Sequence, residues 1–312
     1  MMNLLRAEGM RTLARRLTWV ALVITMLASC LALWTMWEAA RPVSEADKAA
    51  NVAMYENAMR DWEAHKTEMC AGNEECLKQT RPQLEQYGRQ PVPASVVVSS
   101  MAAAGGYFGF FLAMIVAASL MAAEFMTGSL SNYLTFVPNR LKVFASKFAA
   151  TVVTSLALGA VVMAFLVGGG VALSVLAGAT LTGETGISEG LRMGARGLAL
   201  PVIGGLLGML LATILRHTAA AIGVVLGYSF FSGIFTGAIM TLKLDWVVLL
   251  LPESNLAAII NGRYVWYSWL MGQDEVQRQV IVHWTWATAY WVVLLGLLTV
   301  VAAWLFKRRD VS

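Results

Sequence analysis

Apolar residues run through this chain in long uninterrupted stretches, and charged residues are concentrated in the segments between them. A membrane-crossing helix needs about 20 consecutive apolar residues, because the hydrocarbon core is about 30 Å thick and a helix rises ~1.5 Å per residue. Six stretches of about this length or longer contain no Asp, Glu, Lys or Arg, namely 17–37, 90–123, 148–181, 197–215, 217–242 and 279–306. The spans predicted from them are 17–37, 98–123, 148–176, 193–215, 218–240 and 285–306, and the fourth of these includes Arg196 near its start. The pattern therefore predicts an all-α membrane protein with six transmembrane helices.

The third apolar stretch is longer than one crossing requires, since residues 148–181 contain no charge. We expect its helix to bend at Gly168–Gly170 or to extend beyond the bilayer. Other spans contain glycine pairs four residues apart, which let helix backbones approach closely in lipid. These predicted packing seams are Gly105/Gly109, Gly204/Gly208, Gly223/Gly227 and Gly233/Gly237.

The composition agrees with a lipid environment, with 58% hydrophobic and only 13% charged residues. Soluble domains contain about 45–50% apolar and roughly 25% charged residues, so this chain has too few charges to cover a water-facing surface. We expect a multi-pass protein of the plasma (cytoplasmic) membrane, with the lipid bilayer as its surroundings. The basic isoelectric point of about 9.0 gives little support to nucleic-acid binding, because the positive charge is explained by membrane orientation.

The distribution of Lys and Arg predicts that orientation. With six spans, one side holds both termini, the 124–147 loop and the turn at 216–217, and carries 11 basic and three acidic residues, a net charge of +8. The other side carries the remaining 12 basic and 16 acidic residues, a net charge of −4, and the two sides sum to the total of +4. Positive charge marks the cytoplasmic side. Both termini, including the tail 307–312, are therefore expected in the cytoplasm.

The two ends of the first span have separate predictions. Residues 1–16 place Leu5, Met10 and Leu13 near one helical face among four arginines, which predicts an amphipathic helix at the inner membrane interface. Leu27–Cys30 resembles a lipoprotein cleavage box, which leaves a cleaved signal peptide as an alternative. The apolar run continues beyond this box and exceeds the ~7–15-residue apolar core of a signal. We therefore favour an uncleaved span.

Residues 38–97 form a large hydrophilic segment on the outer side. Apolar side chains such as Val52, Tyr55 and Met59 recur there at helical spacing, so the segment is expected to contain an amphipathic helix. Cys70 and Cys76 lie close together in it, and an oxidising compartment favours a disulfide between them over two free thiols.

A second outer segment, 241–284, follows the fifth span, and the shorter outer loop 177–192 precedes the fourth. Pro252-Glu253-Ser254 resembles a helix start. Aromatic residues then cluster, and they predict either an interfacial aromatic belt or a re-entrant outer gate; the residues are Trp266, Tyr267, Trp269, Trp284 and Trp286. Re-entrant or interfacial outer helices are thus expected before the last span.

Motifs for ATP hydrolysis or metal-dependent hydrolysis do not occur. The chain lacks a Gly-Lys-Ser/Thr phosphate loop and a His-Glu-x-x-His pair. We therefore expect no catalytic residues, no metal site and no cofactor on this chain. The spans also contain almost no ionisable residues, which argues against a transporter driven by protons or sodium ions.

The most informative segment follows the second span. It reads Glu124-Phe125-Met126-Thr127-Gly128-Ser129-Leu130 and continues through Pro138 and Arg140 to Lys147. The order of an acidic residue, an aromatic, a Gly-Ser pair, a Pro-x-Arg and a lysine resembles the transmembrane permeases of type-2 ATP-binding-cassette exporters, of the bacitracin-resistance-like and sodium-efflux-like kind. Glu8, Arg15 and Arg16 before the first span and Leu251-Pro252 before the last are similar to that family as well.

The resemblance implies a role for these residues. Glu124–Leu130, Pro138 and Arg140 would belong to a short cytoplasmic coupling helix that docks on a separate ATPase. It also implies a dimeric permease, formed with a second copy or a homologous chain. Two ATPase subunits would hold the ATP and magnesium, and the exported substrate would be an amphipathic peptide, drug or lipid-like molecule. The alternative is a non-transporting sensor or assembly subunit that binds a partner through its outer loop, and Glu124 would then be an ordinary helix cap.

Overall fold

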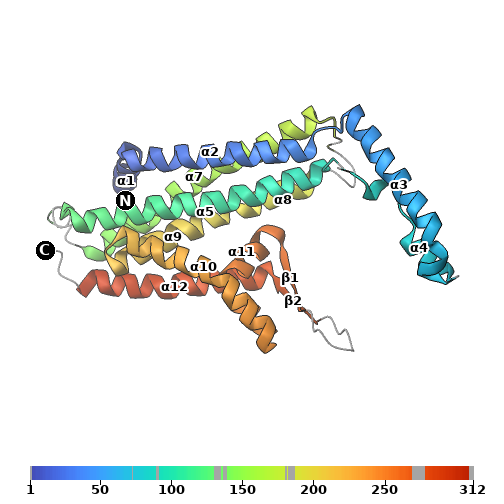
Figure 1. Cartoon of the computed structure of the whole chain (residues 1–312). Coiled ribbons are helices and arrows are strands. Elements are labelled where there is room, and N and C mark those ends of the chain that lie inside the picture. The colour runs from blue at the N-terminus through green and yellow to red at the C-terminus, as the bar shows by residue number, and fades with distance from the viewer. Residues whose placement is uncertain are drawn as a thin grey trace.

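The computed structural model describes residues 2–71, 73–88, 91–129, 135, 139–179, 181, 187–268 and 278–308. In this part of the chain, six helices are long and apolar enough to cross a membrane, as predicted. They are α2 (Arg16–Ala40), α5 (Ala94–Met126), α7 (Arg140–Leu176), α8 with α9 (Ser188–Gly197 and Ala199–Leu215), α10 (Thr218–Leu242) and α12 (Trp284–Arg308). Most of them run side by side in one bundle, with the two chain termini at the same end (Figure 1).

Helices α5 and α9 form the centre of this bundle. Within the apolar window of α5 and in that of α8–α9, 61% of residues are buried, against 6% in α10. A Cβ atom at Gly204 would lie 2.3 Å from the Phe110 carbonyl oxygen, and one at Gly208 would lie 2.3 Å from that of Met114. These two glycines therefore let α9 lie directly against the backbone of α5.

The remaining glycine pairs differ from each other. Gly105 faces α7, because a Cβ atom there would meet Met163, whereas a Cβ atom at Gly109 would lie 2.7 Å from Pro201 of α9 and 3.4 Å from Gly159 of α7. At both glycine pairs of α10, no described atom lies within 4 Å of a Cβ position, so these pairs form no packing seam with the described part of the chain. The prediction of seams therefore holds for α5 and α9 and is wrong for contacts of α10 with the other described helices.

Helix α7 is continuous over 37 residues. At ~1.5 Å per residue it is about 55 Å long, so it extends beyond a hydrocarbon core of ~30 Å. The N-terminal helix α1 (Met2–Ala14) is followed directly by α2, with Arg15 between them in extended conformation. Helix α2 continues through Cys30 to Ala40.

The segment between α2 and α5 forms an arm that projects from the bundle (Figure 1). It contains α3 (Glu45–Cys70), α4 (Glu74–Thr80) and the 3-10 turn η1 (Leu84–Gln86). Ser44 caps α3 by accepting a hydrogen bond from the Asp47 amide. The predicted disulfide is present, with Cys70 and Cys76 bonded and their Cα atoms 5.6 Å apart.

The segment before the last helix contains a feature that the sequence reading missed. It begins with the 3-10 helix η2 (Asp245–Leu250) and α11 (Pro252–Asn261), and α11 starts at the predicted proline. A two-stranded antiparallel hairpin follows, in which β1 (Arg263–Ser268) pairs with β2 (Arg278–His283). The strands read Arg-Tyr-Val-Trp-Tyr-Ser and Arg-Gln-Val-Ile-Val-His, and such runs of aromatic and β-branched residues favour strands. The all-α prediction therefore needs this correction.

Candidate functional site

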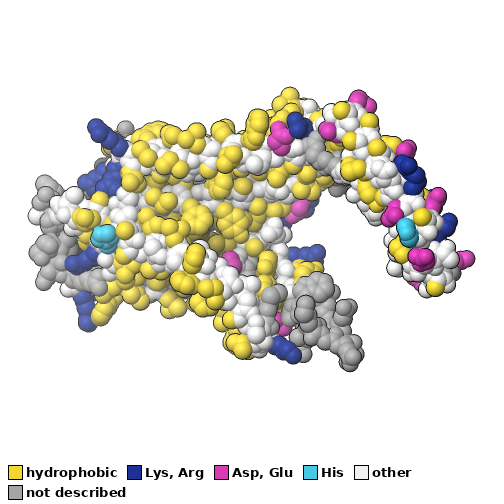
Figure 2. Space-filling model, viewed as in Figure 1, with side chains coloured by type: hydrophobic (Ala, Val, Ile, Leu, Met, Phe, Trp, Pro, Cys, Tyr) yellow, Lys and Arg dark blue, Asp and Glu magenta, His cyan; other side chains and the backbone are white. Residues whose placement is uncertain are grey.

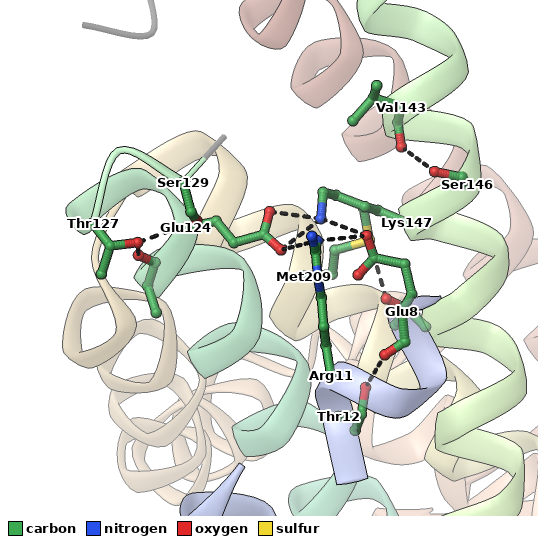
Figure 3. Close-up of polar contacts among 12 residues, drawn as sticks. Glu8, Arg11, Thr12, Glu124, Thr127, Ser129, Val143, Ser146, Lys147 and Met209 are labelled. Atoms are coloured by element: carbon green, nitrogen blue, oxygen red, sulfur yellow. Dashed lines mark hydrogen bonds and ion pairs between the residues drawn. The ribbon is translucent and has the colours of Figure 1, made fainter. Parts of the chain in front are cut away.

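Charged side chains from three helices meet at the end of the bundle that carries the termini. Lys147 of α7 places its Nζ atom 2.6 Å from the Glu124 carboxylate of α5 and 3.1 Å from Oε1 of Glu8 of α1. Arg11 Nη1 lies 3.4 Å from Glu8 and 3.9 Å from Glu124. Figure 3 shows the lysine between the two carboxylates. We call these four residues the ion cluster.

The ion cluster is largely shielded from solvent. The Lys147 side chain is 6% exposed, that of Glu8 10% and that of Glu124 15%, whereas Arg11 is 49% exposed. Buried charges are tolerated when they are paired and hydrogen-bonded, and here two acidic and two basic groups balance. Removing Lys147 would leave two shielded carboxylates with only the half-exposed Arg11.

The position of Glu124 rules out one of its two sequence interpretations. Helix α5 ends at Met126, so Glu124 lies in its last turn and cannot cap the start of a helix. A carboxylate in the last turn is disfavoured by the negative end of the helix dipole. Lys147 offsets this effect through its short contact. The helices also continue past the predicted loop bounds of 124 and 147, because α7 already begins at Arg140.

Further contacts fix α1 and α2 against α5. Arg15 Nη1 donates hydrogen bonds to the Ser119 carbonyl and hydroxyl oxygens, at 3.0 and 3.2 Å. A cavity of about 30 Å³ beside the ion cluster is lined by Glu8, Glu124 and Lys147 together with Met209 and other side chains. This volume is enough for about one water molecule among polar groups. The Arg11 and Ser119 contacts could not be predicted from the sequence, because they depend on how the helices pack.

The predicted coupling residues begin at the end of α5. Phe125 lies under the Arg216 guanidinium, whose Cζ is 5.5 Å from the ring centre, and its ring is 6.3 Å from that of Phe306. Met126 is 70% exposed. The Thr127 hydroxyl donates to the Ala123 carbonyl and bonds the Ser129 hydroxyl.

The rest of the predicted coupling segment is described in part. Gly128 has a φ of +65°, a left-handed conformation that favours glycine. Arg140 donates to the Lys307 carbonyl at 3.3 Å, which joins the start of α7 to the end of α12. Leu130 and Pro138 lie outside the described residues.

The predicted outer aromatic residues lie around α11 and the hairpin. Trp266 is buried, whereas Tyr267, Trp284 and Trp286 are 43–55% exposed. The Trp286 indole donates a hydrogen bond to the Leu249 carbonyl. Trp269 lies outside the described residues. Three of these aromatic side chains are thus accessible, as an interfacial belt requires.

Comparison with known proteins adds one finding. A family model described as "Protein of unknown function (DUF2705)" matches residues 94–312, from the first residue of α5 to the end of the chain. None of the curated proteins matches the chain.

Proposed function

The chain belongs to the DUF2705 family, and we propose that it is the membrane-spanning permease subunit of an ATP-binding-cassette exporter. Its apolar helices supply the membrane pathway, and the segment that connects α5 to α7 receives force from a separate ATPase. Both termini and this connecting segment lie in the cytoplasm in this proposal. The clustering of Lys and Arg at the end that carries the termini supports this orientation (Figure 2).

The ion cluster carries the proposal. Glu124 lies near the end of α5 and Lys147 lies near the start of α7, on either side of the connecting segment. Their ion pair therefore holds the two ends of this cytoplasmic segment together. Glu8 adds α1 to the same contact. A force that the ATPase exerts on the connecting segment would therefore move α1, α5 and α7 together. Because α5 lies at the bundle centre, this motion would reach the helices packed around it.

The partners and cofactors follow from this reading. Two cytoplasmic ATPase subunits would bind ATP and magnesium. Each would dock on the segment that connects α5 to α7 in one of two permease chains. A second permease chain, identical or homologous, would complete the pathway. The sparsely buried helices α2, α10 and α12 offer apolar surface to that chain and to lipid. An open apolar groove of about 430 Å³ between α9 and α12 suits a lipid-like or amphipathic substrate.

Assembly with an ATPase tests the proposal. The tagged chain, expressed with its native neighbours and purified in mild detergent, should co-purify with a protein that contains a phosphate-binding loop. Glu124→Gln keeps an acceptor for Lys147 while Glu8 supplies a negative charge, so we expect folding to survive. The variant should weaken ATPase association or substrate-stimulated ATP hydrolysis. Wild-type association and transport at matched expression would contradict the coupling role.

Gly128 supplies a second pair of variants. Gly128→Asn introduces a small residue that tolerates the left-handed backbone, whereas Gly128→Trp adds bulk at the same position. We expect the tryptophan variant to impair ATPase docking much more strongly than the asparagine variant. Equal effects would point to the backbone rather than to a docking surface.

One observation favours a second function, a membrane sensor or assembly subunit. The disulfide-closed arm of α3 and α4 projects away from the bundle, as a surface for a partner protein would. Deletion of residues 45–86 separates the two functions. It should leave ATPase association intact in a permease and abolish partner binding in a sensor.

A further inference from the structure

A second polar site lies near the hairpin, in the half of the bundle away from the termini. Its centre is Glu253, in the first turn of α11. The Tyr228 hydroxyl of α10 donates a hydrogen bond to its Oε2 atom. Tyr107, Tyr264 and Tyr290 pack on the apolar cluster that contains α11, within electrostatic range of the same carboxylate. Four tyrosines from four different elements are therefore grouped with one acidic side chain.

Only one of the two carboxylate oxygens of Glu253 has a hydrogen-bond partner among the described residues. Its Oε1 atom is buried and has no partner there. No Lys, Arg or His forms an ion pair with it in the described part of the chain. The nearby Arg196 bonds elsewhere, to Glu189 and to the Ile260 carbonyl at the far end of α11. The start of α11 favours a negative charge but supplies no counter-ion.

In the described part of the chain, other buried polar atoms of α11 and of the elements that pack against it also lack partners. They include the indole nitrogens of Trp266 in β1 and Trp291 in α12, whose residues are 8% and 4% exposed. Oδ1 of Asp245 and Oδ1 of Asn255 are unpaired as well. Most buried polar atoms in folded proteins are hydrogen-bonded, so a group of unpaired ones in one region indicates a place where a further molecule binds.

We propose that Glu253 and its tyrosines form a binding site for a lipophilic organic cation, such as an amphipathic amine. A carboxylate attracts the positive charge, and aromatic rings stabilise alkylated cations through their faces. The apolar cluster on which Tyr107, Tyr264 and Tyr290 pack would accommodate the hydrocarbon part of such a molecule. Burial and the Glu253 charge raise the pKa of the Tyr264 hydroxyl, which therefore remains a hydrogen-bond donor at neutral pH. The site would give the exporter its substrate class, and to that extent it rests on the proposed function.

Binding to the isolated permease tests the site. The full-length chain in nanodiscs of zwitterionic lipid, without any ATPase, is equilibrated with labelled tetraphenylphosphonium. Tetraphenylborate, an anion of nearly the same shape, is the control ligand. Wild-type protein should bind the cation saturably and at least about tenfold more tightly than the anion, as expected for a charge-assisted contact.

Variants then assign the binding to Glu253. Glu253→Gln should weaken cation binding about tenfold or more, since a charge-assisted contact is lost, and Glu253→Asp should retain most of it. Glu45→Gln, at a carboxylate that is 89% exposed on the arm, should have no effect. Each variant is compared at matched thermal stability and elution profile.

Two results would overturn the proposal: wild-type protein that does not prefer the cation, or a Glu253→Gln variant that binds it as tightly as wild type. Because the assay contains no ATPase, its outcome is independent of the exporter assignment. If the chain binds the cation but does not co-purify with an ATPase, the exporter assignment is wrong and the cation-binding site still stands.

Discussion

Lys147 Nζ lies 2.6 Å from the carboxylate of Glu124, although the two residues are 23 positions apart and belong to different helices. The contact is shielded from solvent and also includes Glu8. It joins three elements that the sequence places at three separate points: before the first span, after the second and before the third.

The first prediction concerns the stability of the ion cluster. Lys147→Met should destabilise the protein by about 3–5 kcal/mol, because breaking a buried pair leaves an uncompensated charge. Lys142→Met is the matched control, since Lys142 is exposed on the same helix. Thermal unfolding in detergent should show a lower midpoint for the first variant alone. Equal midpoints would mean that the cluster is not needed for the fold.

The second prediction concerns the packing of α9 on α5. Gly208→Ala places a Cβ atom against the Met114 carbonyl and should cost about 1–3 kcal/mol, the usual effect of overpacking. Gly227→Ala, in α10, meets no described atom within 4 Å and should not lower the stability of the monomer, because alanine is the better helix former. The unfolding midpoints of the two variants provide the comparison. A harmless alanine at 208 would be inconsistent with close backbone contact.

The third prediction concerns the disulfide of the arm. Replacing Cys70 and Cys76 by serine should destabilise the tip of the arm by roughly 2–3 kcal/mol, through the added freedom of the unfolded loop. The bundle should be unaffected, because the closed loop spans a sequence separation of only 6. Limited proteolysis should cut the arm faster in the variant while α5–α12 stay intact. Similar cleavage rates in variant and wild type would speak against the prediction.

The fourth prediction concerns orientation. In a background without the native cysteines, cysteines at Ser44 and Gln273 should react with an impermeant thiol reagent on intact cells. Cysteines at Ser131 and Ser312 should react only after lysis. Labelling of position 312 in intact cells would place the C-terminus outside, and the exporter proposal would then fail.

The parts of the fold that the sequence predicts correctly depend on local properties. Apolar length alone identifies the six long helices, and Pro252 marks the start of α11. The short separation of Cys70 and Cys76 made their disulfide predictable. Each of these features is decided within a few residues or by a single helix.

The features that were missed depend on contacts between distant segments. The hairpin of β1 and β2 was hidden because its aromatic residues also fit a membrane interface. Glu124 was expected to begin a helix, but α5 continues past it and its charge is balanced by Lys147. Glu253 lies outside the predicted spans, and its tyrosines come from α5, α10, β1 and α12. No sequence window contains enough of such a site to reveal it.

The arm is long enough that a small tilt at its base would produce a large displacement at its tip. Its neck is closed where the Val92 amide donates to the Ala39 carbonyl, close to the start of α3. Helix α3 has 26 residues and so is about 39 Å long at ~1.5 Å per residue. A rotation of about 10° between α2 and α5 at this neck would sweep the Cys70 end through roughly 7 Å. A spectroscopic label at the tip would therefore convert a small tilt of membrane helices into a displacement large enough to measure.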